Sequence, residues 1–245
     1  RPHTSMVLSL LPATLALLSG SPAIEPRARA AVRMGPALHG SQQSRSPLVN
    51  WYCAEESIEL QMKDPRPSNH PFGQIPFLTD DDGVEVFESG AILLYLADRY
   101  GAASNAAERA SYSKWVVWSN SELDGLCFGA IPGDHRVRGT SMDKPQIKQV
   151  AILEEILGGC DWLVDNSFSV ADVAVGSYLN YVPLFFPNAD LSATPNIAKY
   201  MLRCAERDAF IQAFGPQHAG LVKSKAEGWL SAKGGAPDFM SMFKR

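Results

Sequence analysis

The segment that restricts the fold most is residues 71–76 (PFGQIP), in which Pro76 opens a short apolar run. Proline has no backbone N–H, so at the start of a central strand it removes one ladder hydrogen bond. Two apolar runs, residues 75–78 and 84–87, are joined by the sequence DDDG at residues 80–83. Because aspartate and glycine tolerate positive φ in a tight turn, the pattern predicts a β-hairpin entered through a proline.

The residues around this hairpin alternate between short strands and helices. Residues 36–40 are an apolar strand candidate, and Pro47 suits the first turn of a helix, where its missing N–H would have no partner. Residues 58–63 alternate apolar and polar side chains, which predicts a half-buried strand. An apolar helix over residues 91–100 ends at a glycine. The order is βαβ followed by ββα, so we predict a thioredoxin-like α/β domain over residues 35–101.

The rest of the chain has helical patterns. They cover residues 106–128, 142–164, 169–184 and 195–214. Ser169 precedes Asp172 by three residues, which is the spacing of a capping box at the start of a helix. We therefore predict an all-α C-terminal domain over residues 106–214. A C-terminal tail, residues 215–245, follows it without an assigned structure.

The first 34 residues differ in composition from the rest of the chain. Residues 6–18 are mostly apolar, a run too short for a comfortable transmembrane helix and typical of a signal sequence. Arginines set among alanines follow, and Glu25 is the one acidic residue in this leader, residues 1–34. The leader resembles the two-part leaders of nucleus-encoded plastid proteins in algae, so we expect a plastid location. The alternative is translated upstream sequence ahead of a cytoplasmic protein.

Composition argues against several kinds of partner. The formal net charge is −4 and the sequence has no stripe of lysine and arginine, so nucleic acid is not an expected partner. The four cysteines lie far apart, with no CxxC pair and no metal-binding Cys/His spacing. We therefore predict reduced thiols and no metal.

Three segments together resemble the glutathione transferase superfamily. Residues 41–52 (SQQSRSPLVNWY) are similar to the family's active-site turn and first helix. Residues 71–76 are closely similar to the NPFGQVP motif of the phi class, and residues 87–92 (FESGAI) follow in the family's order. Residues 169–172 (SVAD) are similar to its helical capping box. The resemblance implies the glutathione transferase (GST) fold, in a serine-type, phi- or theta-like member that forms a homodimer.

The resemblance also implies a binding role for five residues. Ile75 and Pro76 are implied to share a cis peptide bond and to present the Ile75 backbone to the cysteinyl backbone of glutathione. Gln74 matches the phi motif and is implied to reach the tripeptide. Glu88 and Ser89 are implied to hold the γ-glutamyl end, at a helix N-terminus whose free N–H groups suit a carboxylate.

Catalysis in this family needs the thiolate of glutathione, because the thiol is a weak nucleophile. A hydroxyl in the turn before the first helix stabilises the thiolate by a hydrogen bond. The candidates are Ser44, Ser46 and Ser41, of which Ser44 is best placed relative to the helix start. The turn has no tyrosine or cysteine, which argues against the branches that use them. Arg45 either adds positive potential near the thiolate or is a surface arginine.

The sequence departs from the family ahead of the GQIP motif. Residues 64–70 (DPRPSNH) are too short for the family's second helix, which in many members holds the glycine carboxylate of glutathione. Lys63, Arg66 or His70 are the available substitutes. On the first helix of the C-terminal domain, Tyr112 and Trp115 are possible residues of the pocket for the electrophile, and Trp118 is expected in the core.

Three functions fit these features. The first is an enzyme that transfers glutathione, as co-substrate, to a small apolar electrophile or uses it to reduce a peroxide. The alternative is a non-catalytic, GST-like docking subunit of a larger assembly such as a photosynthetic complex, which the shortened segment and the C-terminal tail favour. A third is a ligand carrier or isomerase.

Overall fold

The computed structural model describes residues 35–67, 69–101, 105–129 and 139–232, and all of them belong to one compact unit, Met34–Arg245. The leader predicted over residues 1–34, and the part of the predicted C-terminal tail at residues 233–245, lie outside the described residues. Within the described ranges, no helix is both long and apolar enough to cross a membrane.

The N-terminal half is a four-stranded sheet with two helices. The strands lie in the order β2-β1-β3-β4, with β1 parallel to β2 and the other two pairs antiparallel. Leu38 and Leu78, which are paired between the central strands, are both fully buried. The elements are β1 (Ala37–His39), α1 (Ser46–Glu55), β2 (Gln61–Lys63), β3 (Phe77–Thr79), β4 (Glu85–Phe87) and α2 (Ser89–Arg99). The predicted thioredoxin-like order of elements is confirmed.

The strands are shorter than the sequence predicts, for local reasons. β2 begins only at Gln61, because the Ile58 N–H still bonds the Cys53 carbonyl of α1 at 2.8 Å. β3 begins after Pro76, which has no N–H to donate. The hairpin is formed as predicted, with Gly83 at φ 83°. Between β2 and β3 the described residues contain no helix, which confirms that the segment is too short for one.

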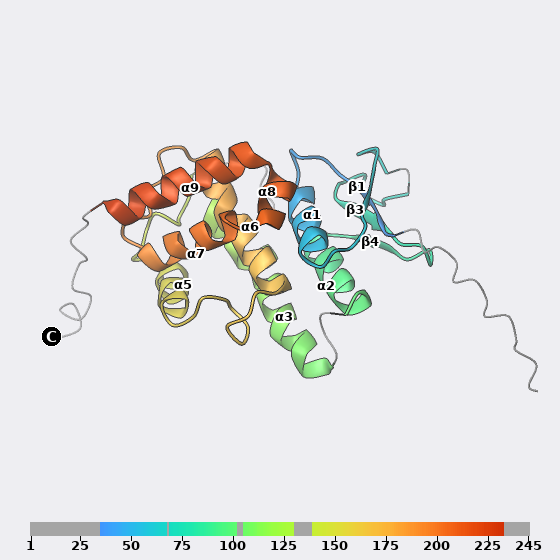
Figure 1. The fold of residues 1–245 in the computed structure, drawn as a ribbon, viewed down its shortest axis with the longest axis horizontal. Coiled ribbons are helices and arrows are strands. Elements are labelled where there is room, and N and C mark those ends of the chain that lie inside the picture. Colours follow the sequence, from blue (N-terminus) through green and yellow to red (C-terminus); the bar gives the residue numbers. More distant parts are fainter. Residues whose placement is uncertain (1–34, 68, 102–104, 130–138, 233–245) are drawn as a thin grey trace, which may run out of the picture. The chain divides into compact units, whose positions relative to one another are not determined.

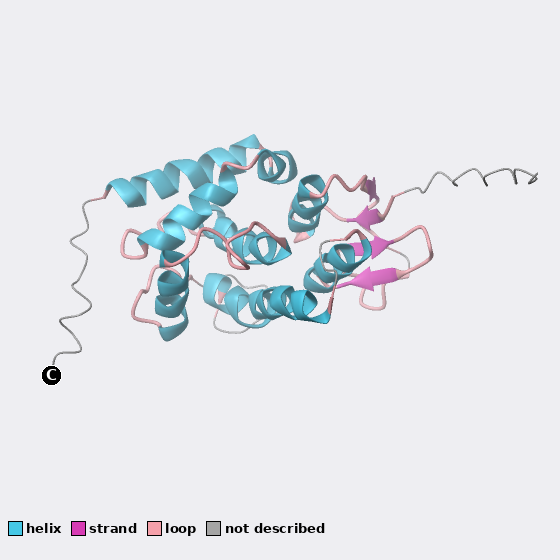
Figure 2. Ribbon diagram, turned by 60° about the horizontal axis from the view of Figure 1, so that its bottom comes forward, coloured by secondary structure: helices cyan, strands magenta, loops and turns pink. Residues whose placement is uncertain are grey.

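The C-terminal half is helical. Its elements are α3 (Ala106–Trp118), a π-helical turn η1 (Ser119–Leu123), α4 (Asp124–Phe128), α5 (Lys148–Gly158), α6 (Val170–Phe185), α7 (Pro195–Ala205), α8 (Asp208–Phe214) and α9 (Pro216–Ser231). α1 and α2 lie between the sheet and these helices, as Figures 1 and 2 show from two directions. The GST fold, a thioredoxin-like half joined to an all-α half, is therefore observed.

Two predicted helices are interrupted. The helix expected over residues 142–164 is limited to α5, because Pro145 disfavours helix before it and Gly158 and Gly159 end it. The helix expected over residues 195–214 breaks at Arg207, whose backbone is extended. The Arg207 guanidinium turns instead toward Glu55 of α1 and donates two hydrogen bonds to its carboxylate, at 2.6 and 2.7 Å.

The tail predicted from residue 215 onward is a helix over much of its length. Gly215 adopts φ 90°, and Pro216 then opens α9, which packs along α7. Figure 1 shows α9 and α7 side by side. Val222, Ala226 and Trp229 are buried, and the Trp229 indole donates to the Ala189 carbonyl at 3.1 Å. The helical half thus extends from residue 214 to at least Ser231.

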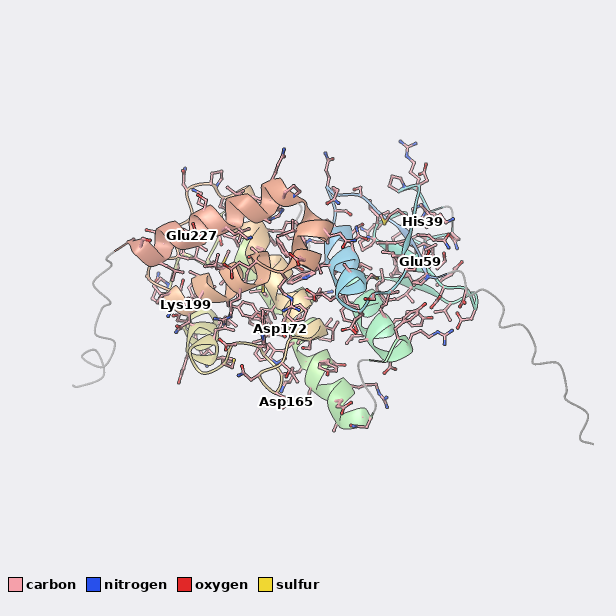
Figure 3. The ribbon with its side chains drawn as sticks, in the orientation of Figure 1. His39, Glu59, Asp165, Asp172, Lys199 and Glu227 are labelled. Atoms are coloured by element: carbon pink, nitrogen blue, oxygen red, sulfur yellow. The ribbon has the colours of Figure 1, made fainter. Side chains whose placement is uncertain are left out.

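The predicted capping box at the start of α6 is present. The Ala171 N–H donates to Ser169 Oγ at 3.3 Å, and the Ser169 N–H donates to Asp172 Oδ2 at 3.0 Å. Asp172 is fully buried among the helices (Figure 3), and the Tyr200 hydroxyl donates to its Oδ1 at 2.9 Å. Burial raises the pKa of the Asp172 carboxyl to about 6, although its hydrogen bonds act in the opposite direction. The four cysteines are free thiols.

Candidate functional site

The turn between β1 and α1 is closed by its own serines. Gly40 must be glycine, because a Cβ there would lie 2.1 Å from Ser46 Oγ. The Ser44 hydroxyl donates to the Ser41 carbonyl at 2.8 Å and accepts the Ser46 N–H at 3.1 Å. Ser46 Oγ, fully buried, lies 2.7 Å from Ser44 Oγ and accepts the Ser41 N–H at 3.1 Å. A hydroxyl has one proton, and that of Ser44 is committed within the turn.

The helical half holds this turn in place. The Tyr181 hydroxyl of α6 donates to the Ser44 carbonyl at 3.1 Å, and Gln42 donates to the Ala213 carbonyl of α8 at 3.1 Å. Burial raises the pKa of Tyr181, so this hydroxyl stays protonated and keeps its donor role. The turn is therefore part of a contact between the two halves.

A cavity of about 460 Å³ lies next to this turn. The five residues implied to bind glutathione line it together: Gln74, Ile75, Pro76, Glu88 and Ser89. The other lining residues are Arg45, His70, Gly73, Asn120, Asp124 and Tyr178. Ser41, Ser44 and Ser46 are not among the lining residues, and Arg45 is the residue of the turn that reaches the cavity.

One wall of the cavity is the N-terminus of α2. Glu88, its N-cap residue, has φ 69° and ψ 122° and makes no side-chain cap. The first bond within the helix joins the Ile92 N–H to the Glu88 carbonyl, so the three preceding N–H groups have no partner within it. Gly90 permits close packing here, because a Cβ would lie 2.6 Å from Asn120 Nδ2. This wall is therefore suited to an anion.

Ile75 forms another wall. The Ile75–Pro76 peptide bond is cis, and Ile75 is half-buried directly ahead of β3. Within the described residues its backbone N–H and C=O make no hydrogen bond to protein. Both groups are therefore available to an extended ligand backbone.

Arg45 enters the cavity from the turn and is held by the helical half. Its guanidinium forms an ion pair with Asp124 of α4. The guanidinium carbon lies 4.2 Å from the ring centroid of Tyr178 and 4.9 Å from that of Phe128. Arg45 Nη2 bonds Asp124, whereas Nη1 is buried and has no hydrogen-bond partner in the described part of the chain.

His70 is the one proposed substitute for the lost helix that lines the cavity. It is 8% exposed, and its Nδ1 accepts the Phe72 N–H at 2.9 Å. Because Nδ1 accepts, the ring proton of the neutral form is on Nε2, which leaves Nε2–H as a donor. Lys63 and Arg66 are exposed and do not line the cavity.

The aromatic residues of α3 lie elsewhere. Trp115 and Trp118 line a separate, largely apolar cavity of about 320 Å³ between α3 and α5. Tyr112 lines a small hollow of about 80 Å³ with α2. The possible placement of Tyr112 and Trp115 beside the electrophile is therefore not observed, and Trp118 is only partly buried.

The helical residues that do line the site were missed from the sequence. Asn120, Asp124 and Tyr178 face the cavity, and the Tyr178 hydroxyl donates to Asn120 Oδ1 at 3.1 Å. The π-helical turn at Ser119–Leu123 changes which residues share a face, and no sequence pattern announces such a turn. The four-residue spacing of Asn120 and Asp124 was the available signal, but residues 119–124 (SNSELD) are mostly polar, so it did not single out these two.

A group of acidic side chains lies in the β3–β4 hairpin, away from the cavity. Asp80, Asp81 and Asp82 could jointly approach a cation, but Arg99 lies within 3.8, 3.6 and 3.5 Å of their carboxylates. Burial pushes the pKa of Asp80 upward, but hydrogen bonds from Tyr95, Asp81 N–H and Tyr100 outweigh it and lower this pKa. The cluster therefore stabilises the hairpin.

Comparison with known proteins points in the same direction as the geometry. Residues 47–98 match the model of the glutathione S-transferase N-terminal domain, and residues 143–208 match that of the C-terminal domain. Glutathione S-transferase GstB of Escherichia coli (strain K12) is 28% identical over 153 residues, which are 57% of this chain and 73% of GstB. Elongation factor 1-gamma of Carassius auratus is 28% identical over 156 residues, which are 60% of this chain and 35% of that protein.

A solved structure shows the same fold. A glutathione transferase family member from Pseudomonas fluorescens pf-5, with two glutathione bound, superposes with a TM-score of 0.60 at 20% identity. The match covers 74% of this chain and 92% of that one. The chain thus has the GST fold, and parts of its two halves match the N-terminal and C-terminal glutathione S-transferase domain models.

Proposed function

We propose that the 460 Å³ cavity binds glutathione. The observation that carries this is the meeting of two separate segments, residues 74–76 and residues 88–89, on one cavity. The cysteinyl backbone pairs with the N–H and C=O of Ile75. The γ-glutamyl carboxylate lies on the free N–H groups of α2 and accepts a hydrogen bond from the Ser89 hydroxyl, and the α-amino group pairs with the Glu88 carboxylate.

His70 completes the glycine end in this proposal. Its Nε2–H is a donor beside the cavity, in the segment where the family's second helix is missing. A single histidine donor compensates for the loss of that helix only in part. We therefore expect glutathione affinity to be modest rather than tight.

The reaction we propose is attack by the glutathione thiolate on an electrophilic carbon. The sulfur–carbon bond forms from the thiolate electron pair, and the leaving group departs with the electrons of the bond that breaks. Peroxide reduction is the second use of the same thiolate. The sulfur takes the terminal peroxide oxygen and releases the alcohol after protonation, and a second glutathione then yields glutathione disulfide and water.

The helical wall of the cavity refines the expected electrophile. Asn120, Asp124 and Tyr178 present polar groups on this side. The Tyr178 hydroxyl donates to Asn120 and Asp124 pairs with Arg45, but a purely apolar molecule would still remove these polar groups from water, which disfavours its binding. We propose a small electrophile that carries a hydrogen-bonding group beside its reactive carbon.

The competing proposal is a non-catalytic docking module. The Ser44 proton is committed within the turn, and elongation factor 1-gamma is among the similar proteins. Retention on immobilised glutathione, together with turnover of a chlorodinitrobenzene-type substrate, separates the two. Retention with turnover supports the enzyme, retention without turnover supports the docking module, and a chain that is not retained excludes the glutathione site.

Two further proposals concern the state of the protein. An apolar groove of about 350 Å³ between α2 and α3 includes Leu94, Val116 and Val117, and the Val117 side chain is 57% exposed. We propose that a second copy of the chain covers this groove. Light scattering of the purified chain measures its mass, and the mass of a single chain would contradict the proposal.

We also propose delivery to a plastid, which rests on residues 1–34 alone. A fluorescent fusion of those residues that stays in the cytoplasm would refute it.

A further inference from the structure

We infer that Arg45, and not a serine hydroxyl, is the group that stabilises the glutathione thiolate. The inference rests on the proposed function, because it concerns the same cavity and the same ligand. It changes the chemistry of the site, since a hydroxyl offers one neutral donor whereas a guanidinium offers charge and several donors.

The serine hydroxyls are already in use. Ser44 donates to the Ser41 carbonyl, and Ser46 is fully buried against Ser44 and Ser41. Neither hydroxyl lines the cavity. A thiolate would have to break a 2.8 Å hydrogen bond inside the turn before Ser44 could donate to it.

The start of α1 offers little in place of a hydroxyl. Pro47 has no N–H, and the Ser46 N–H is bonded to Ser44 Oγ. Two of the amides that usually make a helix N-terminus attractive to an anion are therefore absent or occupied.

Unlike the serines, Arg45 lines the cavity and has an N–H donor that is not already in use in the described part of the chain. It is the one lysine or arginine among the residues that line the cavity, and its buried Nη1 has no partner in the described residues. A buried N–H without a partner is unfavourable, and a hydrogen bond to an anionic sulfur would offset that cost. Asp124 bonds Nη2 and not Nη1, and the Arg45 side chain as a whole is 31% exposed.

The guanidinium is also fixed in position before any ligand arrives. Asp124 holds one edge, and the rings of Tyr178 and Phe128 lie within 4.2 and 4.9 Å of its central carbon. A donor fixed in advance stabilises a developing charge without a cost of reorganisation. The carboxylate of Asp124 weakens the positive potential without removing the N–H donor.

The step itself is a simple ionisation. The S–H bond of bound glutathione breaks, its proton passes to water, and the electron pair stays on sulfur. Arg45 keeps its protons and donates an N–H hydrogen bond to the sulfur. Arg45 is therefore a catalytic residue in the sense that it touches the reacting atom.

The test is a titration of the bound thiol, followed by the ultraviolet absorbance of the thiolate in glutathione-saturated protein. In Arg45→Met we expect a pKa of bound glutathione about one unit higher, which lowers the fraction of thiolate about tenfold at a pH below both pKa values. Ser44→Ala should leave the titration unchanged. Arg109→Met is the matched control, because Arg109 is a half-exposed arginine paired with Asp98 outside the cavity.

S-methylglutathione, which has no thiol proton, separates a thiolate role from a carboxylate role. The inference predicts that wild type and Arg45→Met bind it within about threefold of each other. Equal loss of affinity for glutathione and S-methylglutathione in Arg45→Met would mean that Arg45 holds a carboxylate, and would overturn the inference. An unchanged titration in Arg45→Met, or a raised one in Ser44→Ala, would overturn it as well.

Two further variants guard against misfolding. Arg45→Met leaves Asp124 without its cation, so the double variant Arg45→Met/Asp124→Asn removes both charges and should titrate like Arg45→Met. Arg45→Lys keeps a charge and should recover part of the thiolate fraction. If wild type binds neither glutathione nor S-methylglutathione, the proposed function itself fails, which is a different result from any of those above.

Discussion

At the scale of single residues, Glu88 combines backbone strain with a proposed ligand contact. Its φ of 69° lies in the left-handed region, which costs a residue other than glycine about 1 kcal/mol or more. Glu88→Gly should therefore raise the free energy of unfolding by about 1 kcal/mol and weaken glutathione binding, since the carboxylate is lost. Chemical denaturation and calorimetric titration measure the two effects.

Ser57 is the matched control for that variant. It is exposed, has φ 55° and lies outside the cavity. Ser57→Gly should stabilise the protein to a similar degree and leave glutathione affinity unchanged. If Glu88→Gly destabilises the protein while Ser57→Gly stabilises it, Glu88 makes a structural contact that this account lacks.

Asp172 makes stability depend on pH. Its folded-state pKa of about 6 lies above its ordinary value of 3.8, so the folded state holds the proton to higher pH than the unfolded state does. The stability linked to this group is fully present below the ordinary pKa and is lost as pH rises through about 6, a change on the order of 3 kcal/mol. Unfolding of wild type and Asp172→Asn across this range should show wild type losing stability relative to the variant. Parallel pH profiles would contradict the assignment.

At the scale of elements, α1 is tied to the helical half through Glu55. Its carboxylate accepts from the Trp51 indole at 2.8 Å and from Arg207 twice, and the Arg207 guanidinium lies 3.6 Å from the Phe168 ring centroid. Because Arg207 is partly exposed, we expect Glu55→Gln to cost only about 1–2 kcal/mol. Urea denaturation measures this cost. Glu206→Gln, at an exposed neighbouring position, should be neutral, and equal effects of the two variants would show that the pair has no specific role.

The last helix, α9, belongs to the folded core. Trp229 is 8% exposed and fills the space beside α7 and the Ala189 carbonyl. Trp229→Ala should lower the free energy of unfolding by about 3–5 kcal/mol, because it leaves a cavity and an unpaired carbonyl. Glu227→Ala, at an exposed position of the same helix (Figure 3), is the control. A stability loss below about 1 kcal/mol in Trp229→Ala would mean that α9 is only loosely attached to the folded core.

At the scale of the whole molecule, the sequence predicted the features that depend on local chemistry. The proline of the GQIP motif, the DDDG hairpin and the Ser169–Asp172 cap each act within a few residues, and each is found where expected. They contributed to the predicted order of elements, whereas the five lining residues of the cavity were expected from the resemblance of residues 71–76 and 87–92 to glutathione transferases.

The features of the fold and the cavity that were not predicted depend on contacts between residues far apart in the chain, which a single sequence does not display. Arg45 faces the cavity because Asp124 and two aromatic rings of the helical half hold it there. The predicted helix breaks at Arg207, where the Arg207 guanidinium donates two hydrogen bonds to the Glu55 carboxylate of α1. Spacing placed Ser44 near the thiol, but only the three-dimensional turn shows its proton bonded to the Ser41 carbonyl.

The central claim is that the cavity between the cis-proline loop and α2 binds glutathione. Calorimetric titration of glutathione into wild type, Glu88→Gln and Ser89→Ala tests it most directly, with the exposed Glu59→Gln as control. We predict saturable binding of one glutathione per chain, weakened about tenfold or more by either cavity variant and unchanged in the control. Absence of binding to wild type, or binding that all three variants retain equally, would contradict the account.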